Sequence, residues 1–417
     1  MTEGLIAVAL AIAGLTLITL QDAGAFIKAV VWGFTLLVLL LHIAGRAVTA
    51  PERLRAAIAE VVHDWWPVMG LAIFILAGSF VARFADDIRE TFLGFGIGML
   101  FLPLVAVAVR SSARPLVFLK LLAFVYVCTV LGMLALLGAG RGPFHEEIFV
   151  GVPLGAYFLS IRPLRPGHAL LGLALIGACL LSVKNTTFLL VLTTLTACTI
   201  VWIARVASGR DQLRAVTGIY FALLTLVGLI VALVAAYFQY KSQLPSGSPE
   251  YRIERYGIAW RRFLDSPLWG SAFTDSAVTY FELYRVAVAT QHLPTHSDVL
   301  DILAHGGIVG FLLWGLTAWR LMAIGRDSLR VVAAGSVSGQ ASGATADMRA
   351  WRWLFVASLV QVGAIVTYAF NPLLHRPSHG VVIWGVAGVM WALHRHLTEG
   401  LRQRSARGEA VQRPVLA

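Results

Sequence analysis

Charged residues are scarce in this sequence. Asp, Glu, Lys and Arg together account for 13% of its 417 residues, whereas soluble domains contain roughly 25%. Hydrophobic residues account for 58%, and they form uninterrupted blocks about as long as a bilayer is thick. This pattern excludes an ordinary water-soluble globule. It also excludes a β-barrel, because barrel strands alternate between polar and apolar residues. The sequence therefore predicts an all-α integral membrane protein.

Cysteine is also rare, which excludes a disulfide framework. The three cysteines, Cys128, Cys179 and Cys198, all lie inside apolar blocks. None of them belongs to a CxxC motif of the kind that binds metals. We therefore interpret them as packing residues within the membrane.

Basic residues outnumber acidic ones, which raises the question of an anionic partner. The formal net charge is +11, from 33 Lys and Arg against 22 Asp and Glu. The arginines stand singly or in small groups between apolar blocks, as do the orientation signals of membrane proteins. We therefore expect membrane lipids around the chain and no nucleic-acid partner.

Apolar runs long enough to cross a bilayer recur along the whole chain. The run at 147–160 is short for a span. In all, the sequence predicts about twelve transmembrane helices, near residues 4–20, 26–44, 65–82, 91–109, 115–138, 147–160, 168–183, 186–204, 215–239, 298–320, 352–371 and 378–394.

The distribution of basic residues predicts the orientation of these helices. With both termini in the cytoplasm, 21 of the Lys and Arg residues fall in inner segments and 6 in short outer loops. The remaining 6 fall in one long outer loop. Because cytoplasmic loops of membrane proteins carry the excess of basic residues, we expect both termini to be cytoplasmic.

The predicted spans divide the chain into four regions. We expect nine transmembrane helices in residues 1–239, the long outer loop in residues 240–297, the last three helices in residues 298–394, and a basic cytoplasmic tail in residues 395–417.

Two segments on the predicted cytoplasmic side lack the long apolar run of a transmembrane helix. Residues 51–64 mix charged and apolar positions after Pro51, which predicts a helix lying on the inner membrane face. Residues 331–347 are rich in Gly and Ser, which predicts a flexible cytoplasmic linker.

The long outer loop contains an amphipathic segment. The run from Tyr251 to Leu264 places apolar residues on one helical face, while Arg255 and Arg262 lie on another. Arg252 borders the apolar face, so a helix at the membrane surface would hold its guanidinium at the depth of lipid phosphates. Two interpretations are open: a site for a phosphate-bearing substrate, and an interfacial helix whose arginines reach lipid headgroups.

Two further residues at the outer face are candidates for chemistry. Thr295 and Asp298 have the spacing of a capping box, which predicts His296 in the first turn of the next helix. The positive end of a helix dipole disfavours a protonated imidazole, so His296 is a candidate base. The alternative is a histidine that only forms structural hydrogen bonds at the membrane interface. Lys184, in a short outer turn, is a candidate cation or an ordinary loop lysine.

The loop also resembles the O-antigen ligase and O-antigen polymerase family. The stretch from His296 to Gly310 is similar to the family signature HNxxLxxLxexGxxG. The resemblance covers about 60 residues. Upstream, the family segment RxxxWxxAxxxF/IxxxPxxGxG is matched in register by Arg252, Tyr256, Ala259, Phe263, Pro267, Gly270 and Ala272.

This resemblance implies roles for individual residues. Members of the family transfer a glycan from undecaprenyl pyrophosphate, with a periplasmic histidine as base and an arginine on the pyrophosphate. By this resemblance His296 is the base and Arg252 binds the pyrophosphate. Our mechanistic hypothesis adds Lys184 and Arg255 as further cations on the leaving pyrophosphate. The resemblance further implies a GT-C-like fold in the bacterial inner membrane, with the active site facing the periplasm.

Three departures from the family pattern bear on the expected function. Lys184 stands where the family usually has the arginine of an S-x-R turn, and lysine keeps the charge but loses bidentate phosphate recognition. Ser297 replaces an asparagine, and His305 replaces an acidic residue. These departures affect the expected substrate specificity more than the expected reaction class.

The resemblance favours an O-antigen ligase that transfers the glycan, with inversion, to a hydroxyl of lipid A-core. The nearest alternative is a polymerase whose acceptor is a second lipid-linked glycan. A lipid-linked glycan transporter is an alternative of a different class, against which the absence of an internal repeat argues.

No cofactor or metal is expected, because no D-x-D motif or His/Asp cluster in the predicted outer segments provides an evident metal site. The acidic residues near the start of the fourth predicted span, Asp86, Asp87 and Glu90, are interpreted as solvated interface charge rather than as metal ligands.

Overall fold

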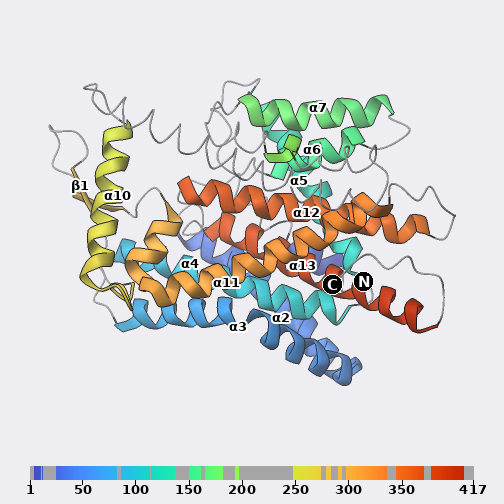
Figure 1. Ribbon diagram of the computed structural model, residues 1–417, viewed down its shortest axis with the longest axis horizontal. Coiled ribbons are helices and arrows are strands. Elements are labelled where there is room, and N and C mark those ends of the chain that lie inside the picture. Colours follow the sequence, from blue (N-terminus) through green and yellow to red (C-terminus); the bar gives the residue numbers. More distant parts are fainter. Residues whose placement is uncertain are drawn as a thin grey trace.

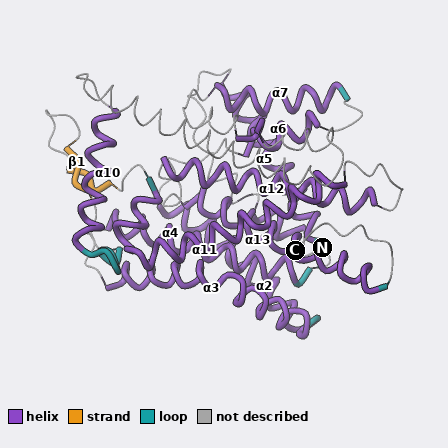
Figure 2. The backbone as a smooth tube through the Cα atoms, in the orientation of Figure 1, coloured by secondary structure: helices purple, strands orange, loops and turns teal. Residues whose placement is uncertain are grey.

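Helices make up nearly all of the fold in the computed structural model of the chain (Figure 1, Figure 2). The described residues are 4–10, 12, 25–81, 86–112, 114–137, 150–160, 165–181, 193–196, 248–273, 279–282, 290–293, 297–335, 344–370 and 377–407.

The helices follow the apolar runs of the sequence. They are α2 (Ala25–Thr49), α3 (Pro51–Val81), α4 (Asp86–Arg110), α5 (Pro115–Leu137), α6 (Gly151–Ser160), α7 (Pro166–Leu181), α10 (Ser248–Asp265), α11 (Asp298–Gly335), α12 (Ala344–Phe370) and α13 (Pro377–Ala406).

A small hairpin departs from the all-α expectation. Strands β1 (Thr279–Glu282) and β2 (Thr290–Leu293) pair antiparallel within the outer loop, with Thr279 opposite Leu293. The strands lie beside α10 (Figure 2).

The helices confirm the multi-pass membrane character of the chain. Among the described residues, six helices are long and apolar enough to cross a membrane: α2, α3, α4, α5, α11 and α12. Every predicted span that falls on described residues coincides with helix. The spans at 186–204 and 215–239 fall almost wholly outside those residues. The count of twelve and the cytoplasmic termini therefore stay predictions.

The helix predicted at 51–64 is present, but it is not separate from the next span, because these residues are the first part of α3, which runs unbroken to Val81. Pro51 suits the first helical position, where no backbone N–H is needed. Glu60 and Asp64, whose charges favoured a water-facing helix, instead bind arginines of other helices. Sequence alone does not show such distant partners.

Helix also extends into both predicted cytoplasmic segments. α11 continues to Gly335 and α12 begins at Ala344, so the linker predicted at 331–347 was too long, and residues 336–343 lie outside the described part. α13 continues to Ala406. Residues 395–406 therefore extend the last helix rather than forming a separate tail.

The helices α3, α4, α11, α12 and α13 lie side by side along the long axis of the molecule, and α10 runs across their left-hand end (Figure 1). Large side chains fill the core between them, among them Trp65, Trp351 and Trp384. α4 and α13 approach especially closely, since a Cβ on Gly388 would lie 2.7 Å from the carbonyl oxygen of Leu102. Small residues permit such close packing of membrane helices.

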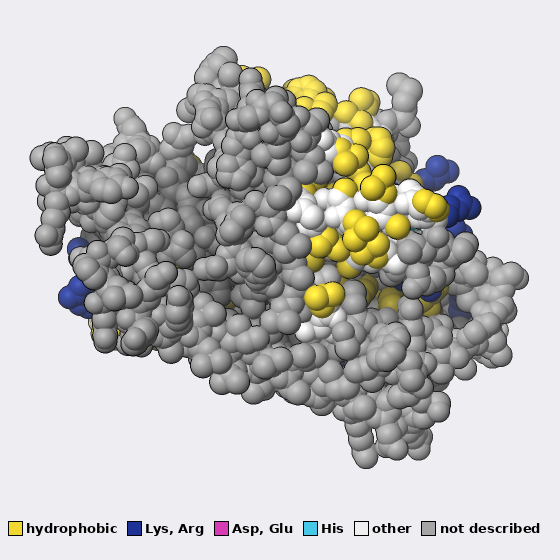
Figure 3. Space-filling view, turned by 90° about the horizontal axis from the view of Figure 1, so that it is seen from above, with side chains coloured by type: hydrophobic (Ala, Val, Ile, Leu, Met, Phe, Trp, Pro, Cys, Tyr) yellow, Lys and Arg dark blue, Asp and Glu magenta, His cyan; other side chains and the backbone are white. Residues whose placement is uncertain are grey.

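The described surface is apolar along the flank of this bundle. Leu312 and Trp319 on α11 are among its exposed large side chains. Figure 3 shows hydrophobic side chains gathered to the right of the centre of one face, with Lys and Arg beside them on the right and at the left-hand end. An apolar flank with basic ends is the distribution that a bilayer requires.

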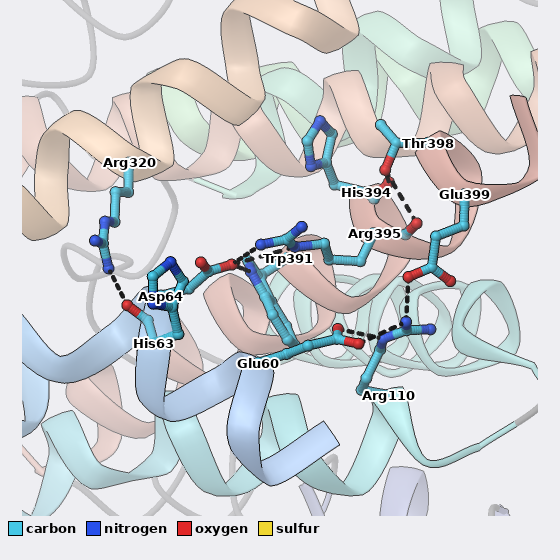
Figure 4. Close-up of polar contacts among 10 residues, drawn as sticks. All are labelled: Glu60, His63, Asp64, Arg110, Arg320, Trp391, His394, Arg395, Thr398 and Glu399. Atoms are coloured by element: carbon cyan, nitrogen blue, oxygen red, sulfur yellow. Dashed lines mark hydrogen bonds and ion pairs between the residues drawn. The ribbon is translucent and has the colours of Figure 1, made fainter. Parts of the chain in front are cut away.

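An arginine on α4 joins three helices (Figure 4). The Nε of Arg110 lies 2.9 Å from a carboxylate oxygen of Glu60 on α3, and its Nη2 lies 3.1 Å from the other oxygen. The same guanidinium binds Glu399 on α13. This bidentate, partly buried arrangement ties α4 to both neighbours.

A second ion pair reinforces the same interface (Figure 4). The carboxylate of Asp64 on α3 binds the guanidinium of Arg395 on α13 and accepts a 2.8 Å hydrogen bond from the indole N–H of Trp391. Gly78, near the other end of α3, lies against Ala272, just after α10. Asp64 precedes Gly78 by 14 positions, or roughly 20 Å of helix. The network therefore lies well away from α10.

Replacement of Arg110 by Gln should destabilise the bundle, because it leaves two carboxylates without their shared cation. We expect a loss of roughly 2 kcal/mol in the free energy of unfolding, less than for a fully buried pair because these groups are partly exposed. Arg55→Gln is the matched control, since Arg55 pairs with Glu52 on the solvent-exposed surface. Unfolding midpoints in detergent would measure both, and equal midpoints for the two variants would contradict the prediction.

Candidate active site

The two motif segments of the outer loop lie on α10 and at the beginning of α11. α10 packs against α11, and Ala259 is buried. A turn at residues 266–273 follows α10, and within it the amide of Gly270 donates to the carbonyl of Ser266 at 2.8 Å. This turn carries the interactions that fix α10 to the bundle.

α11 is interrupted at Gly307. The backbone there has φ 59° and ψ −157°, a conformation that essentially only glycine adopts. In an unbroken helix the amide of Ile308 would donate to the carbonyl of Ala304, and the amide of Val309 would donate to the carbonyl of His305. Inside a membrane protein, groups released in this way need other partners.

The turn accepts hydrogen bonds from both released amides. The amide of Ile308 donates to the carbonyl oxygen of Pro267 at 2.8 Å. The amide of Val309 donates to the carbonyl oxygen of Leu268 at 3.2 Å. The C-terminal side of the interruption is therefore fully bonded.

The turn also donates to both released carbonyls. The carbonyl oxygen of Ala304 accepts from the amide of Ser271 and from its hydroxyl, each at 3.1 Å. The carbonyl oxygen of His305 accepts from the amide of Phe273 at 3.2 Å. The interruption in α11 and the turn thus complete each other's backbone hydrogen bonds. We call this set of contacts the backbone exchange.

Two glycines make the backbone exchange sterically possible. Gly270 and Gly307 both have positive φ, of 61° and 59°. A Cβ on Gly270 would lie 2.6 Å from the amide nitrogen of Gly307, and a Cβ on Gly307 would lie 2.5 Å from the amide nitrogen of Gly270. Neither position tolerates a side chain.

The last residues of the turn contact α3 as well. Ala272 has a φ of 53°, which suits the glycine of the family pattern better than alanine, and its carbonyl oxygen lies directly against Gly78. The buried ring of Phe273 meets Phe74 edge-on, with centroids 5.7 Å apart, and stacks on His305 at 5.4 Å. The turn is therefore held between α3 and α11.

The N-cap of α11 lies two residues after Thr295, the predicted cap. Ser297 is the N-cap, because its hydroxyl accepts from the amide of Leu300 at 3.3 Å and its carbonyl accepts from the amide of Asp301 at 3.0 Å. α11 therefore begins at Asp298, after His296 rather than around it. Serine, like the asparagine of the family signature, is a preferred cap, so this departure preserves the start of the helix.

Polar side chains lie buried along one face of α11 behind this cap. Asp298, Asp301 and His305 are spaced three and four residues apart and are all buried. Buried carboxylates are costly unless they are well bonded, and they often mark functional regions of membrane proteins. The sequence pattern predicted Asp298 only as part of a capping box and predicted no role for Asp301, although their position just after the candidate base was a signal.

The predicted cations belong to two different segments. Arg252 and Arg255 lie in the first half of α10, one turn apart, and their side chains lie outside the described part. Lys184 and His296 also lie outside the described residues. The roles assigned to these four residues therefore stay predictions.

The described residues offer no group of three or more His, Cys, Asp or Glu that could hold a metal ion. Asp86, Asp87 and Glu90 stand at the start of α4, where acidic residues complement the helix dipole. Their side chains fall outside the described part, so their interpretation as interface charge stays a prediction.

Comparison with known proteins bears on this region of the chain. The model of the family described as O-antigen ligase matches residues 170–315. No curated protein matches the sequence. The family match confirms the resemblance seen in the motifs. It spans α7, Lys184, α10, the turn and the start of α11.

Gly307→Ala should disrupt the backbone exchange. Its backbone conformation alone costs a non-glycine residue about 1–3 kcal/mol, and the added Cβ would meet the turn at 2.5 Å. We expect a clear fall in the thermal unfolding midpoint of the purified chain.

Gly315→Ala, on the same helix, is the matched control. A Cβ there meets nothing within 4 Å among the described residues, and alanine is the better helix former. The midpoint of this variant should stay or rise. Equal midpoints for Gly307→Ala and the parent chain would show that the interruption is not needed.

Proposed function

We propose that this chain, whose residues 170–315 match the O-antigen ligase family, transfers a glycan from undecaprenyl pyrophosphate to an acceptor hydroxyl at the periplasmic face of the bacterial inner membrane. The acceptor of the proposed reaction is lipid A-core. The reaction proceeds with inversion and without a divalent ion.

The backbone exchange is the observation that supports this proposal best. It bonds the turn after α10 to the beginning of α11 through four groups. Arg252 is part of α10, and His296 immediately precedes the Ser297 cap of α11. The segments that carry a candidate phosphate ligand and a candidate base are therefore fixed at one end of the bundle.

The proposed reaction needs only a base and cations. Neutral His296 takes the proton of the acceptor hydroxyl, and the acceptor oxygen bonds to the anomeric carbon. The bond from that carbon to the phosphate oxygen breaks, and undecaprenyl pyrophosphate leaves. Arg252, Arg255 and Lys184 balance the negative charge of the leaving group.

The start of α11 suits His296 to this role. The cap formed by Ser297 leaves the positive end of the helix dipole beside the preceding residue. A positive potential disfavours protonation of a nearby imidazole. A neutral imidazole is the form that accepts a proton.

Replacement of His296 by Ala should abolish most of the transfer activity. General-base catalysis contributes about 10²–10⁴-fold to a rate, and we expect a loss of this size in kcat with purified chain, lipid-linked donor and lipid A-core. His63→Ala is the control, because His63 is an exposed residue in the first half of α3. Activity retained by the His296 variant would reject the proposed base.

The same reconstituted reaction separates ligase from polymerase. Supplied with donor alone, a polymerase would form longer lipid-linked glycans, whereas a ligase needs lipid A-core to consume the donor. Gel or mass analysis of the products measures chain length directly. Elongation without lipid A-core would replace the ligase proposal with the polymerase one.

Substitutions of Lys184 test whether its charge stabilises the leaving pyrophosphate. Lys184→Arg should keep or raise activity, because arginine restores the bidentate geometry typical of phosphate recognition. Lys184→Met should lower kcat by about 100-fold, the usual effect of removing one group that stabilises developing charge. Equal rates for the two variants, measured with saturating donor, would remove Lys184 from the site.

A further inference from the structure

α10 has an apolar face that is wider than its contact with the bundle. Ala259 is buried, and Tyr256 and Phe263 beside it are half-buried. Trp260 and Leu264, on the adjoining side of the helix, are 50% and 56% exposed. The neighbouring helices thus cover only part of the apolar face.

The turn after α10 extends this uncovered surface. Leu268 and Trp269 are 53% and 54% exposed, although the ring of Trp269 also touches Phe74 of α3, with centroids 6.3 Å apart. Together with Trp260 and Leu264, they place four large, half-exposed apolar side chains within ten residues of a polar loop. We call these four residues the exposed loop patch.

The exposed loop patch continues the lipid-facing flank of α11. The amide of Ile308 bonds to the turn at Pro267, immediately before Leu268. From there Ile308, Leu312, Leu316 and Trp319 are all exposed on one side of a helix that is long and apolar enough to span the membrane. One apolar stripe therefore runs from the side of the bundle onto the loop.

Charge on α10 is segregated from the patch. Arg261 follows Trp260 by one position and flanks the apolar face, whereas Arg262 points to the side opposite Trp260. Both side chains are exposed. Tryptophan and arginine side by side at the end of a membrane span are typical of the membrane–water interface.

We propose that the exposed loop patch rests in the headgroup–acyl boundary of an anionic phospholipid leaflet. Trp260, Leu264, Leu268 and Trp269 enter the boundary, and Arg261 contacts lipid phosphates. The run of α10 across the end of the bundle (Figure 1) is the orientation that such a helix requires. A second copy of the chain is a less suitable occupant, because the patch is continuous with a flank that lipid already covers. This inference does not depend on the proposed glycosyl transfer.

Spin labels at paired positions of α10 would test the proposal. The three native cysteines are replaced by alanine, and a single cysteine is introduced at Leu264 or at Arg262, both of which are exposed. The full chain is reconstituted without donor in nanodiscs of phosphatidylcholine and phosphatidylglycerol. We expect the ratio of oxygen accessibility to nickel-chelate accessibility to be several-fold higher at position 264 than at position 262, because oxygen partitions into the apolar boundary.

Two results would overturn the proposal. A ratio at position 264 as low as that at position 262 and as that of a water-exposed label would place the patch in water. Dipolar broadening of the label at 264 that disappears when labelled chain is diluted with unlabelled chain would show that a second copy covers the patch.

Fluorescence provides an independent measurement in the chain with its native cysteines. Trp260→Phe should remove a component of the emission that lipids brominated near the headgroup quench, whereas Trp65→Phe, at a buried position, should remove an unquenched one. An unquenched component at Trp260 would contradict the lipid contact. Because no donor is present, quenching cannot arise from a bound polyprenyl substrate.

Discussion

The backbone exchange between α11 and the turn is the interaction on which the end of the bundle that carries α10 depends. An interruption within a membrane helix releases amides and carbonyls that lipid cannot satisfy. In this chain the amides bond to Pro267 and Leu268, and the carbonyls bond to Ser271 and Phe273. α10 and the turn that follows it are therefore part of the bundle rather than an appendage. Any movement of α10 relative to α11 would leave polar backbone groups without partners.

This exchange lies at one end of a bundle that ion pairs stabilise elsewhere. Arg110 and Asp64 join α3, α4 and α13 through charges that sit between helices. Among the described residues, the contacts between α10, the turn and α11 are in contrast mainly those of main-chain atoms and of the ring of Phe273. The first kind of contact depends on side chains of matching charge, whereas the second depends on glycine and on shape.

Run length and hydrophobicity were sufficient to predict most helices, because crossing a bilayer imposes a length that a sequence displays directly. They failed where a partner is distant. Glu60 and Asp64 suggested a surface helix because their arginines lie far away in the sequence. The cap of α11 was misplaced because Thr295 and Ser297 are both suitable residues, and only backbone geometry distinguishes them.

The motifs of the candidate site could be predicted from the sequence, but the contacts that hold these motifs in place could not. The family pattern identifies Gly270 and Gly307 as fixed positions, and the structure supplies the reason, since each occupies the space that the other's side chain would need. The burial of Asp298 and Asp301 next to the candidate base also needed the structure. Periodicity places these residues on one face of a helix but does not show whether that face meets protein or water.

Because α11 is interrupted at Gly307, the order in which the turn and this helix are synthesised matters for how the helix forms. Ser271 precedes its partner Ala304 by 33 residues, so the ribosome releases the turn well before the helix that needs it. Without the turn in place, the amides of Ile308 and Val309 and the carbonyls of Ala304 and His305 would lack the partners that the finished chain gives them.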